Sequence, residues 1–276
     1  KRCETFNQHS LDLHISKGGK MNSWKTMIIA SSLGLEDINH QTDYSEQECV
    51  ILLHGLARTP SSMRILEWSL KNAGYRVINI GYPSRQATIA KLSEDVLSRA
   101  VDMCGNTSKI HIVTHSLGGI ILRQWSIKHR LLNAGRAVML GPPNGGSELV
   151  DAFKDWPVFE TIHGPAGKQL GKKSGSLISD LPVCSDFDLG IIAGSRSINP
   201  LASAFISGPN DGKVSVSSAF SIAARDKLVL PVSHTWMTIH PKVVEQVERF
   251  IKQGSFSKVD EKNCNIDELN PRNDTR

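Results

Sequence analysis

The feature that most constrains the fold is the stretch KIHIVTHSLGGIILRQW at residues 109–125. An apolar run that contains Ile110 and Ile112 leads directly into the turn THSLGG, and a stretch with helical character follows at once. A serine at such a strand-to-helix turn projects its hydroxyl from the carboxyl edge of a sheet, with small residues needed two positions to either side. On these residues alone, an ordinary tight turn with a capping serine stays open as the alternative.

The rest of the chain alternates in the same way. We expect strands at residues 49–55, 75–83, 109–116, 136–143, 189–195 and 226–232, and helices at 61–74, 88–105, 120–130 and 241–254. Strands that alternate with helices favour an α/β fold, with a mostly parallel central sheet and helices on both faces. Residues 147–188 are less regular, and we expect them to form a short irregular cover over the site.

The domain organisation follows from where this pattern starts and stops in the 276-residue chain. Residues 46–256 carry it, and they predict one domain between a poorly ordered leader at 1–45 and a polar tail at 257–276. Met21 opens a short apolar run that faintly resembles a signal peptide, although no clear cleavage site follows.

The composition excludes several classes of protein. Hydrophobic residues make up 39% and charged residues 21%, as in globular chains. The net charge of +5 is mild and the basic residues are dispersed, so nothing favours binding to nucleic acid. No apolar stretch reaches the roughly 18 residues of a membrane span.

The cysteines are widely scattered, their number is odd and none forms a CxxC pair: Cys3, Cys49, Cys104, Cys184 and Cys264. This pattern favours unpaired thiols in a reducing compartment over a metal site, with a single disulfide left open. We therefore favour a cytoplasmic protein, or a periplasmic or secreted one if Met21 starts a signal peptide.

A serine nucleophile needs a base, and four histidines follow Ser116: His129, His163, His234 and His240. His234 comes just past the last predicted strand, where a loop could bring its imidazole over the serine. His240 precedes Pro241 at the predicted start of a helix, where a boundary role is the plainer interpretation. We therefore expect His234 to be the base.

The predicted acid is Asp211 in the segment GPNDGKVSV, a tight loop beyond the fifth strand. The alternative is an ordinary turn aspartate, which is common in Asn-Asp-Gly sequences. The other acids in this half of the chain precede or open strands and are less suitable: Asp180, Asp186, Asp188 and Asp226. Glycine at the end of the first strand, in His54-Gly55, allows the next N–H to face the site, and the N–H groups of Leu56 and Leu117 would form an oxyanion hole.

The chain resembles bacterial α/β-hydrolases of the lipase and esterase type. The resemblance lies in the segments LLHGLARTPSSM, GYPSR, HIVTHSLGGIILR, VMLGPPNGGSELVD, GPNDGKVSVSSA and SHTWM, in family order. It implies Ser116 as nucleophile, Asp211 as acid, His234 as base and Leu56 and Leu117 as oxyanion donors. We expect further substrate contacts at His54, Gly55, His115, Pro143 and Asn144. Thr114 departs from the usual elbow glycine, and the absence of a long helical cap makes a large lid less expected.

The predicted function is hydrolysis of short to medium acyl esters, with a small-molecule or lipid ester as substrate and with no cofactor or metal. Thioester cleavage or acyl transfer by the same residues is the alternative, and a non-catalytic member that binds acyl or lipid ligands is another. Apolar residues of the irregular stretch would either line an acyl pocket or form the core of a buried helix: Leu149, Val150, Phe153, Trp156, Val158, Phe159 and Ile162. The sequence does not define the oligomeric state.

Overall fold

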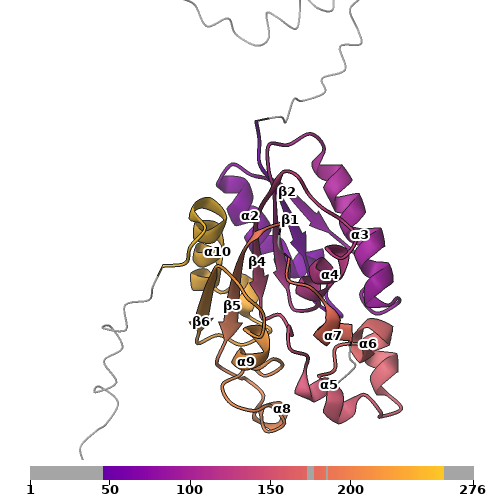
Figure 1. Ribbon diagram of the computed structural model, residues 1–276. Coiled ribbons are helices and arrows are strands. Elements are labelled where there is room, and N and C mark those ends of the chain that lie inside the picture. Colours follow the sequence, from indigo (N-terminus) through magenta and orange to yellow (C-terminus); the bar gives the residue numbers. More distant parts are fainter. Residues whose placement is uncertain (1–45, 173–176, 185, 258–276) are drawn as a thin grey trace, which may run out of the picture. The chain divides into compact units, whose positions relative to one another are not determined.

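The computed structural model describes residues 46–172, 177–184 and 186–257 (Figure 1). The predicted leader at 1–45 and the tail from residue 258 onward lie outside the described residues. No helix in the described part is both long and apolar enough to cross a bilayer.

The described residues contain one parallel sheet in the strand order β2-β1-β3-β4-β5-β6. Its strands are β1 (Cys49–Leu53), β2 (Arg76–Ile80), β3 (Ile110–His115), β4 (Ala134–Leu140), β5 (Asp188–Gly194) and β6 (Asp226–Leu230). Each corresponds to a predicted strand. Because β1 and β3 are neighbours while β2 lies at the edge, the direction of strand addition reverses after β2. In open α/β sheets, ligands bind outside the carboxyl ends of strands at such a point.

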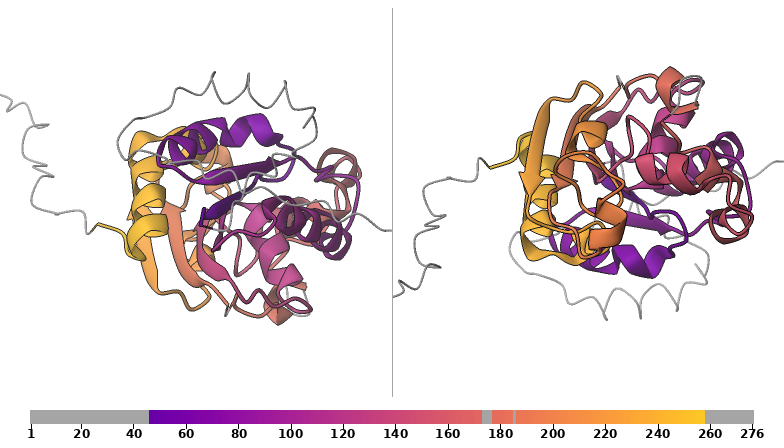
Figure 2. Two further views of the ribbon diagram at one scale, coloured as in Figure 1. Left: turned by 90° about the horizontal axis from the view of Figure 1, so that it is seen from above. Right: turned by 90° about the horizontal axis from the view of Figure 1, so that it is seen from below.

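The longer helices cover the two faces of this sheet. They are α2 (Arg64–Asn72), α3 (Ile89–Cys104), α4 (Leu117–Trp125) and α10 (Pro241–Gln253), and the short η1 (Pro60–Met63) precedes α2. α3 and α4 lie on one face, while α2 and α10 lie on the other (Figures 1 and 2).

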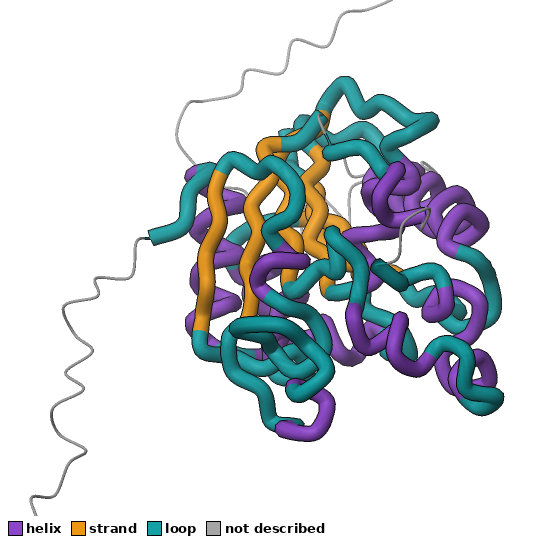
Figure 3. The backbone as a smooth tube through the Cα atoms, turned by 60° about the horizontal axis from the view of Figure 1, so that its bottom comes forward, coloured by secondary structure: helices purple, strands orange, loops and turns teal. Residues whose placement is uncertain are grey.

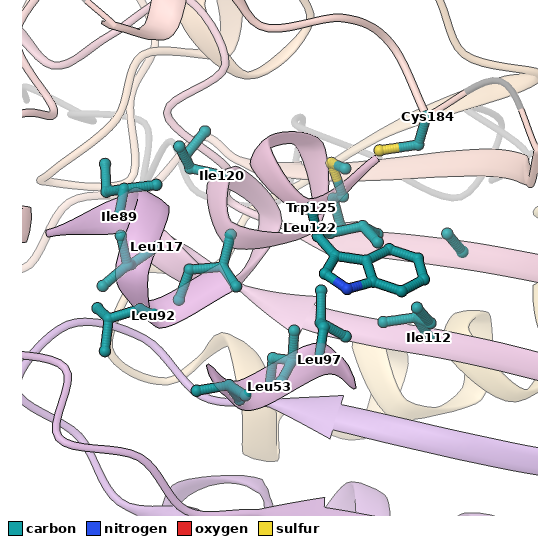
Figure 4. Close-up of a cluster of buried hydrophobic side chains, with 14 of the residues drawn as sticks. Leu53, Ile89, Leu92, Leu97, Ile112, Leu117, Ile120, Leu122, Trp125 and Cys184 are labelled. Atoms are coloured by element: carbon teal, nitrogen blue, oxygen red, sulfur yellow. The ribbon is translucent and has the colours of Figure 1, made fainter. Parts of the chain in front are cut away.

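The side chains of β1 show why the sequence of this strand is a continuous apolar run. Cys49, Ile51 and Leu53 point into the core beneath α3 and α4, whereas Val50 and Leu52 point into the core beneath α2 and α10. All five are fully buried. A parallel strand that is covered on both faces has no solvent-facing position. Its sequence therefore does not alternate between apolar and polar residues. Figure 4 shows the first of these cores, where Leu53 lies among side chains of α3 and α4.

Short elements gather at the carboxyl ends of the strands, which the arrowheads mark in Figure 1 and which face forward in Figure 3. They are α5 (Glu148–Phe153), α6 (Phe159–Lys168), α7 (Leu177–Asp180), α8 (Pro200–Ser203), α9 (Val216–Ala219) and η2 (Met237–Ile239). The cover predicted as irregular is therefore largely helical. Its helices are short, and α6 is kinked where Gly164 has a φ of 68° and Pro165 follows, so the sequence shows no sustained helical period.

The prediction of unpaired cysteines is corrected by the structure. Cys49, at the start of β1, forms a disulfide with Cys104, at the end of α3, across a sequence separation of 55 residues. α3 packs over β1, which brings these two ends together. Cys184 is free and buried, and Cys3 and Cys264 lie outside the described residues. Since disulfides persist mainly in oxidising compartments, the cysteines no longer favour a cytoplasmic location.

Candidate active site

Ser116 occupies the turn between β3 and α4, as predicted. Its φ of 53° is unusual for a residue with a side chain and indicates a strained turn. The Ser116 N–H donates to the carbonyl oxygen of Leu140 in β4 at 2.9 Å, which fixes the turn against the sheet. Gly118 is required because a Cβ there would lie 2.7 Å from the carbonyl oxygen of Leu53. Thr114, the departure from the usual elbow, is fully buried.

His234 and Asp211 form a buried pair at the ends of neighbouring strands. Asp211 follows β5 and His234 follows β6, and the His234 Nδ1 lies 2.7 Å from the Asp211 Oδ2. The other carboxylate oxygen, Oδ1, accepts hydrogen bonds from the N–H groups of Lys213 at 2.9 Å and Val214 at 2.8 Å. The His234 N–H also donates to the Asp211 carbonyl oxygen at 3.0 Å. These contacts orient both side chains.

Gly141 shows how closely β4 approaches this pair. It has a φ of 52°, and a Cβ there would lie 3.0 Å from the Asp211 Oδ2 and 3.1 Å from the His234 Nδ1. Its N–H donates to the Ile192 carbonyl oxygen at 2.8 Å, which anchors it to β5. Only a residue without a side chain suits both the conformation and the space.

The loop after β1 approaches the serine from the other neighbouring strand. A Cβ on Gly55 would lie 3.2 Å from the Ser116 Cβ, so this loop passes directly beside the turn. Ala57 has a positive φ of 54°, and its N–H donates to the Ser84 Oγ at 3.0 Å. Within residues 46–172, 177–184 and 186–257, the N–H groups of Leu56 and Leu117 have no hydrogen-bond acceptor.

A cavity of about 820 Å³ brings the predicted residues together. Ser116, Asp211 and His234 line it, as do Gly55, Leu56, His115 and Pro143 among the other predicted residues. Its opposite wall contains all seven apolar side chains of the predicted cover: Leu149, Val150, Phe153, Trp156, Val158, Phe159 and Ile162. Val150 and Phe159 belong at the same time to the buried core under α3 and α4, whereas Trp156, Val158 and Ile162 are exposed.

The structure does not place His54 or Asn144 on the cavity wall, although both were predicted to contact substrate. His54 is fully buried and stacks on Tyr82, with ring centroids 4.0 Å apart, and burial lowers its pKa. The Asn144 amide donates to the Ala219 carbonyl oxygen at 3.0 Å. Both side chains make contacts that support the loops behind the cavity. Leu117 likewise buries its side chain in the core, and it is not among the residues that line the cavity.

His115 lies directly under His234. The His115 Nε2 lies 3.1 Å from the His234 carbonyl oxygen, to which it donates as an Nε2–H. Burial, and then the neighbouring His234, hold the pKa of His115 well below its usual value, so this imidazole is neutral. It thus supports the His234 loop without adding charge.

The other three histidines that follow Ser116 do not pair with an acid at the cavity. His129 contacts Glu94 at 3.1 Å outside the cavity, and His240 begins α10. His163 does line the cavity, but its Nδ1 contacts the Phe159 carbonyl oxygen at 3.1 Å instead of an acid.

The alternative acids also lie away from the cavity. None of them contributes to its lining: Asp180, Asp186, Asp188 and Asp226. Asp188 pairs with Arg225 at 3.1 Å, and the Asp226 carboxylate accepts from the Phe256 N–H at 2.8 Å. Among the described residues, no group of three or more His, Cys, Asp or Glu could hold a metal ion.

Two cationic residues that the sequence analysis did not select also line the cavity, Arg58 and Lys213. The sequence does contain a signal for them. Each lies two positions after a predicted site residue, Leu56 in one case and Asp211 in the other.

Neither a family model nor a curated protein matches the sequence. Solved structures match it at low identity. The mature lipase BlEst2 of Bacillus licheniformis is 21% identical with a TM-score of 0.57, covering 79% of this chain and 95% of that one. A carboxyl esterase of metagenomic origin is 16% identical with a TM-score of 0.58, covering 77% of each chain. A thermophilic esterase from Thermogutta terrifontis is 16% identical with a TM-score of 0.50, covering 75% and 90%.

Proposed function

We propose that this chain, which has the α/β-hydrolase fold, hydrolyses carboxylic esters through an acyl-enzyme formed on Ser116. The observation that carries the proposal is the His234–Asp211 pair, 2.7 Å apart, on the wall of the same cavity as the strained Ser116 turn. A tight turn with a capping serine would need no such pair. The Ser116 side chain also makes no capping hydrogen bond to α4.

In the proposed mechanism His234 is the general base. With its Nδ1–H donated to Asp211, the neutral imidazole has its Nε2 free to take the Ser116 hydroxyl proton. The serine oxygen attacks the ester carbonyl, and the alcohol leaves with a proton from His234. Water then adds to the acyl-enzyme by the same route and releases the acid.

The proposed oxyanion donors are the N–H groups of Leu56 and Leu117. Both lack an acceptor among the described residues, and the turns that present them lie side by side at Gly55 and Ser116. Each fixed donor in such a site contributes on the order of 10²-fold or more to turnover. The position of Leu117 at the start of α4 adds the favourable end of a helix dipole.

We further propose short to medium acyl esters as substrates. The cavity is mostly apolar on the side of α5 and α6, which suits an acyl chain. Its volume of about 820 Å³ has to hold the scissile group and both parts of the ester, so a long chain would extend out of it.

The proposal is tested by labelling and turnover of Ser116→Ala. We expect a fluorophosphonate to label the wild-type protein at Ser116, and the variant to lose labelling and at least about 10³-fold in p-nitrophenyl butyrate hydrolysis. Ser126→Ala is the matched control, because Ser126 lies at the other end of α4 and outside the cavity. Unchanged turnover by folded Ser116→Ala would overturn the proposal, and labelling without ester turnover would favour acyl transfer or thioester cleavage.

A further inference from the structure

We propose that Arg58 and Lys213 form an anion-binding site beside Ser116, so that the preferred substrates are esters carrying a phosphate or carboxylate group. The inference rests on the ester hydrolysis proposed above and specifies its substrate class. Both cations line the cavity that contains Ser116, although neither is needed for proton transfer.

The backbone of the loop that carries Arg58 is fixed. The Arg58 N–H donates to the Gly55 carbonyl oxygen at 3.3 Å, and the preceding Ala57 N–H donates to the Ser84 Oγ at 3.0 Å. Ala57 also has a positive φ, which marks a tight turn at this point. The guanidinium is therefore presented from a defined position on the same loop as the proposed donor Leu56.

Lys213 is fixed in the same manner. Its N–H donates to the Asp211 Oδ1 at 2.9 Å, and its carbonyl oxygen accepts from the Ser147 Oγ at 3.4 Å. Its side chain reaches solvent at the cavity. One cation thus follows the proposed oxyanion donor, and the other follows the proposed acid.

Neither cation has a partner within the described ranges. Arg58 and Lys213 form no ion pair within 4.0 Å and no side-chain hydrogen bond there. Lysines on the neighbouring cover behave differently, since Lys154 pairs with Asp151 at 3.4 Å and Lys172 pairs with Glu148 at 3.2 Å. Both carboxylate oxygens of Asp211 already accept hydrogen bonds. The two positive charges are therefore left for a ligand.

The positive charges of Arg58 and Lys213 affect the pKa values of groups at the cavity. Burial lowers the pKa of Lys213, the positive charge of Arg58 lowers it further, and Asp211 acts in the opposite direction. Arg58 and Lys213 also contribute to the lowered pKa of His115, after burial and His234. An anion bound between these cations would relieve their repulsion and gain charge-assisted hydrogen bonds. A guanidinium fork matches the geometry of both phosphate and carboxylate.

The apolar side chains on the α5 and α6 side of the cavity suit the acyl part of the substrate. Phe153, Val158 and Ile162 offer an apolar surface for an acyl chain, while the cations lie at the strand-end loops. The molecule that fits both walls is an amphiphile, an acyl ester whose alcohol part carries an anionic group. Attraction by the two cations would also speed its arrival at low salt.

The test compares three octanoyl esters that differ in charge. They are neutral 1-octanoylglycerol, 1-octanoylglycerol 3-phosphate and the carboxylate O-octanoylglycolate, all kept below their aggregation limits. For the wild-type protein we expect kcat/KM on the phosphate or the carboxylate ester to exceed that on the neutral ester about tenfold or more, the size of a charged hydrogen bond.

The double variant Arg58→Gln/Lys213→Gln should bring this ratio close to one, mainly through a higher KM on the anionic ester. A merely structural role would lower all three rates together and leave the ratio unchanged. Lys213→Arg should retain the preference because it keeps the charge. Lys168→Gln, at an exposed lysine that pairs with Glu160 outside the cavity, controls for the change in net charge.

Several results would overturn the anion site. One is equal kcat/KM on neutral and anionic esters, and another is a preference that survives the double variant. Competitive inhibition of neutral ester hydrolysis by inorganic phosphate, without any preference for the anionic esters, would indicate a site for free phosphate and contradict the substrate claim. Absence of hydrolysis of every ester, with no fluorophosphonate labelling, would instead contradict the proposed function.

Discussion

The two walls of the cavity are built by different forces. On the wall formed by strand ends, the Asp211 carboxylate accepts three hydrogen bonds from His234, Lys213 and Val214. Among the cavity-lining side chains of the cover, the contacts include ring pairs: the Phe153 ring centroid lies 4.9 Å from that of Trp156 and 5.1 Å from that of Phe205, which follows α8. Hydrogen bonds are directional and fix positions closely, whereas apolar contacts tolerate displacement.

This difference suggests separate roles for the two walls: the strand-end wall carries the reacting groups, and the cover influences which esters are preferred. Residues proposed to react lie on loops tied to a sheet whose central strands β1 and β3 are fully buried, while the cover presents partly exposed apolar side chains, with Trp156 62% and Ile162 50% exposed. We therefore expect substitutions on the strand-end wall to change the rate for every ester. Substitutions on the cover should change the relative rates for different esters.

The largest expected effect is that of His234→Ala, which removes the proposed base from the strand-end wall. Turnover of p-nitrophenyl butyrate should fall on the order of 10³-fold or more, because the serine hydroxyl is then not activated. His240→Ala is the control, since His240 begins α10 away from the cavity and should leave the rate within about twofold. If the His240 variant were the inactive one, the base would be misassigned.

A smaller loss is expected from Asp211→Asn. The amide can still contact the imidazole, but it can present an N–H to the His234 Nδ1 and favour the wrong tautomer. In a comparable triad the acid matters about 10- to 100-fold less than the nucleophile or base. Steady-state rates of the variants measured side by side decide this. A loss greater than that of His234→Ala would show that the carboxylate chiefly holds the loop structure.

Acyl chain length tests the cover. Because the cavity is limited in volume, kcat/KM on C4–C8 p-nitrophenyl esters should exceed that on C16 esters by about tenfold. No sharp rise in rate should occur when the substrate exceeds its solubility. A preference for C16, or a clear jump at the solubility limit, would show that α5 and α6 act as a true lipase lid.

The smallest effect is expected from Trp156→Ala on the cover. This change should lower kcat/KM on the C8 ester by about two- to fivefold and leave the C2 ester unaffected, because only the longer chain reaches the ring. Trp68→Ala is the matched control, because Trp68 on α2 is similarly exposed, at 65%, but lies outside the cavity. An equal loss of kcat/KM on the C2 and C8 esters would contradict this prediction. It would show that Trp156 stabilises the strand-end wall and does not contact the acyl chain.

The strand-end wall could be predicted because its signals are local. Ser116 directly follows the fully buried β3, while Asp211 and His234 were selected by the turn and loop residues around them in the connections after β5 and β6. A position at the end of a strand does not by itself predict that a side chain lines the cavity. The His54 ring, for example, stacks on Tyr82. The direction in which a side chain points depends on contacts with segments distant in sequence.

The cover was harder to predict for a related reason. Its apolar residues were recognised, but the kink at Gly164 and Pro165 conceals the helical period of α6. The pairing of Cys49 with Cys104 depends on α3 packing over β1, which spacing alone does not define. Arg58 and Lys213 are proposed as an anion site because they lack partners among the described residues, and that is a property of their three-dimensional surroundings.

The disulfide between Cys49 and Cys104 has a consequence for anyone who handles this protein. It closes a loop that contains β1, α2, β2 and α3. Ser116, Asp211 and His234 lie outside this loop, and Leu56 and Arg58 lie inside it but past the opposite end of β1 from Cys49. Cross-linking a loop of that length restricts the unfolded chain and typically stabilises a protein by about 2–4 kcal/mol. Preparations kept with and without a thiol reductant should therefore catalyse the same reaction at the same initial rate, but lose it at different temperatures. A comparison of storage lifetimes or melting curves between laboratories is meaningful only when the redox state of the sample is stated.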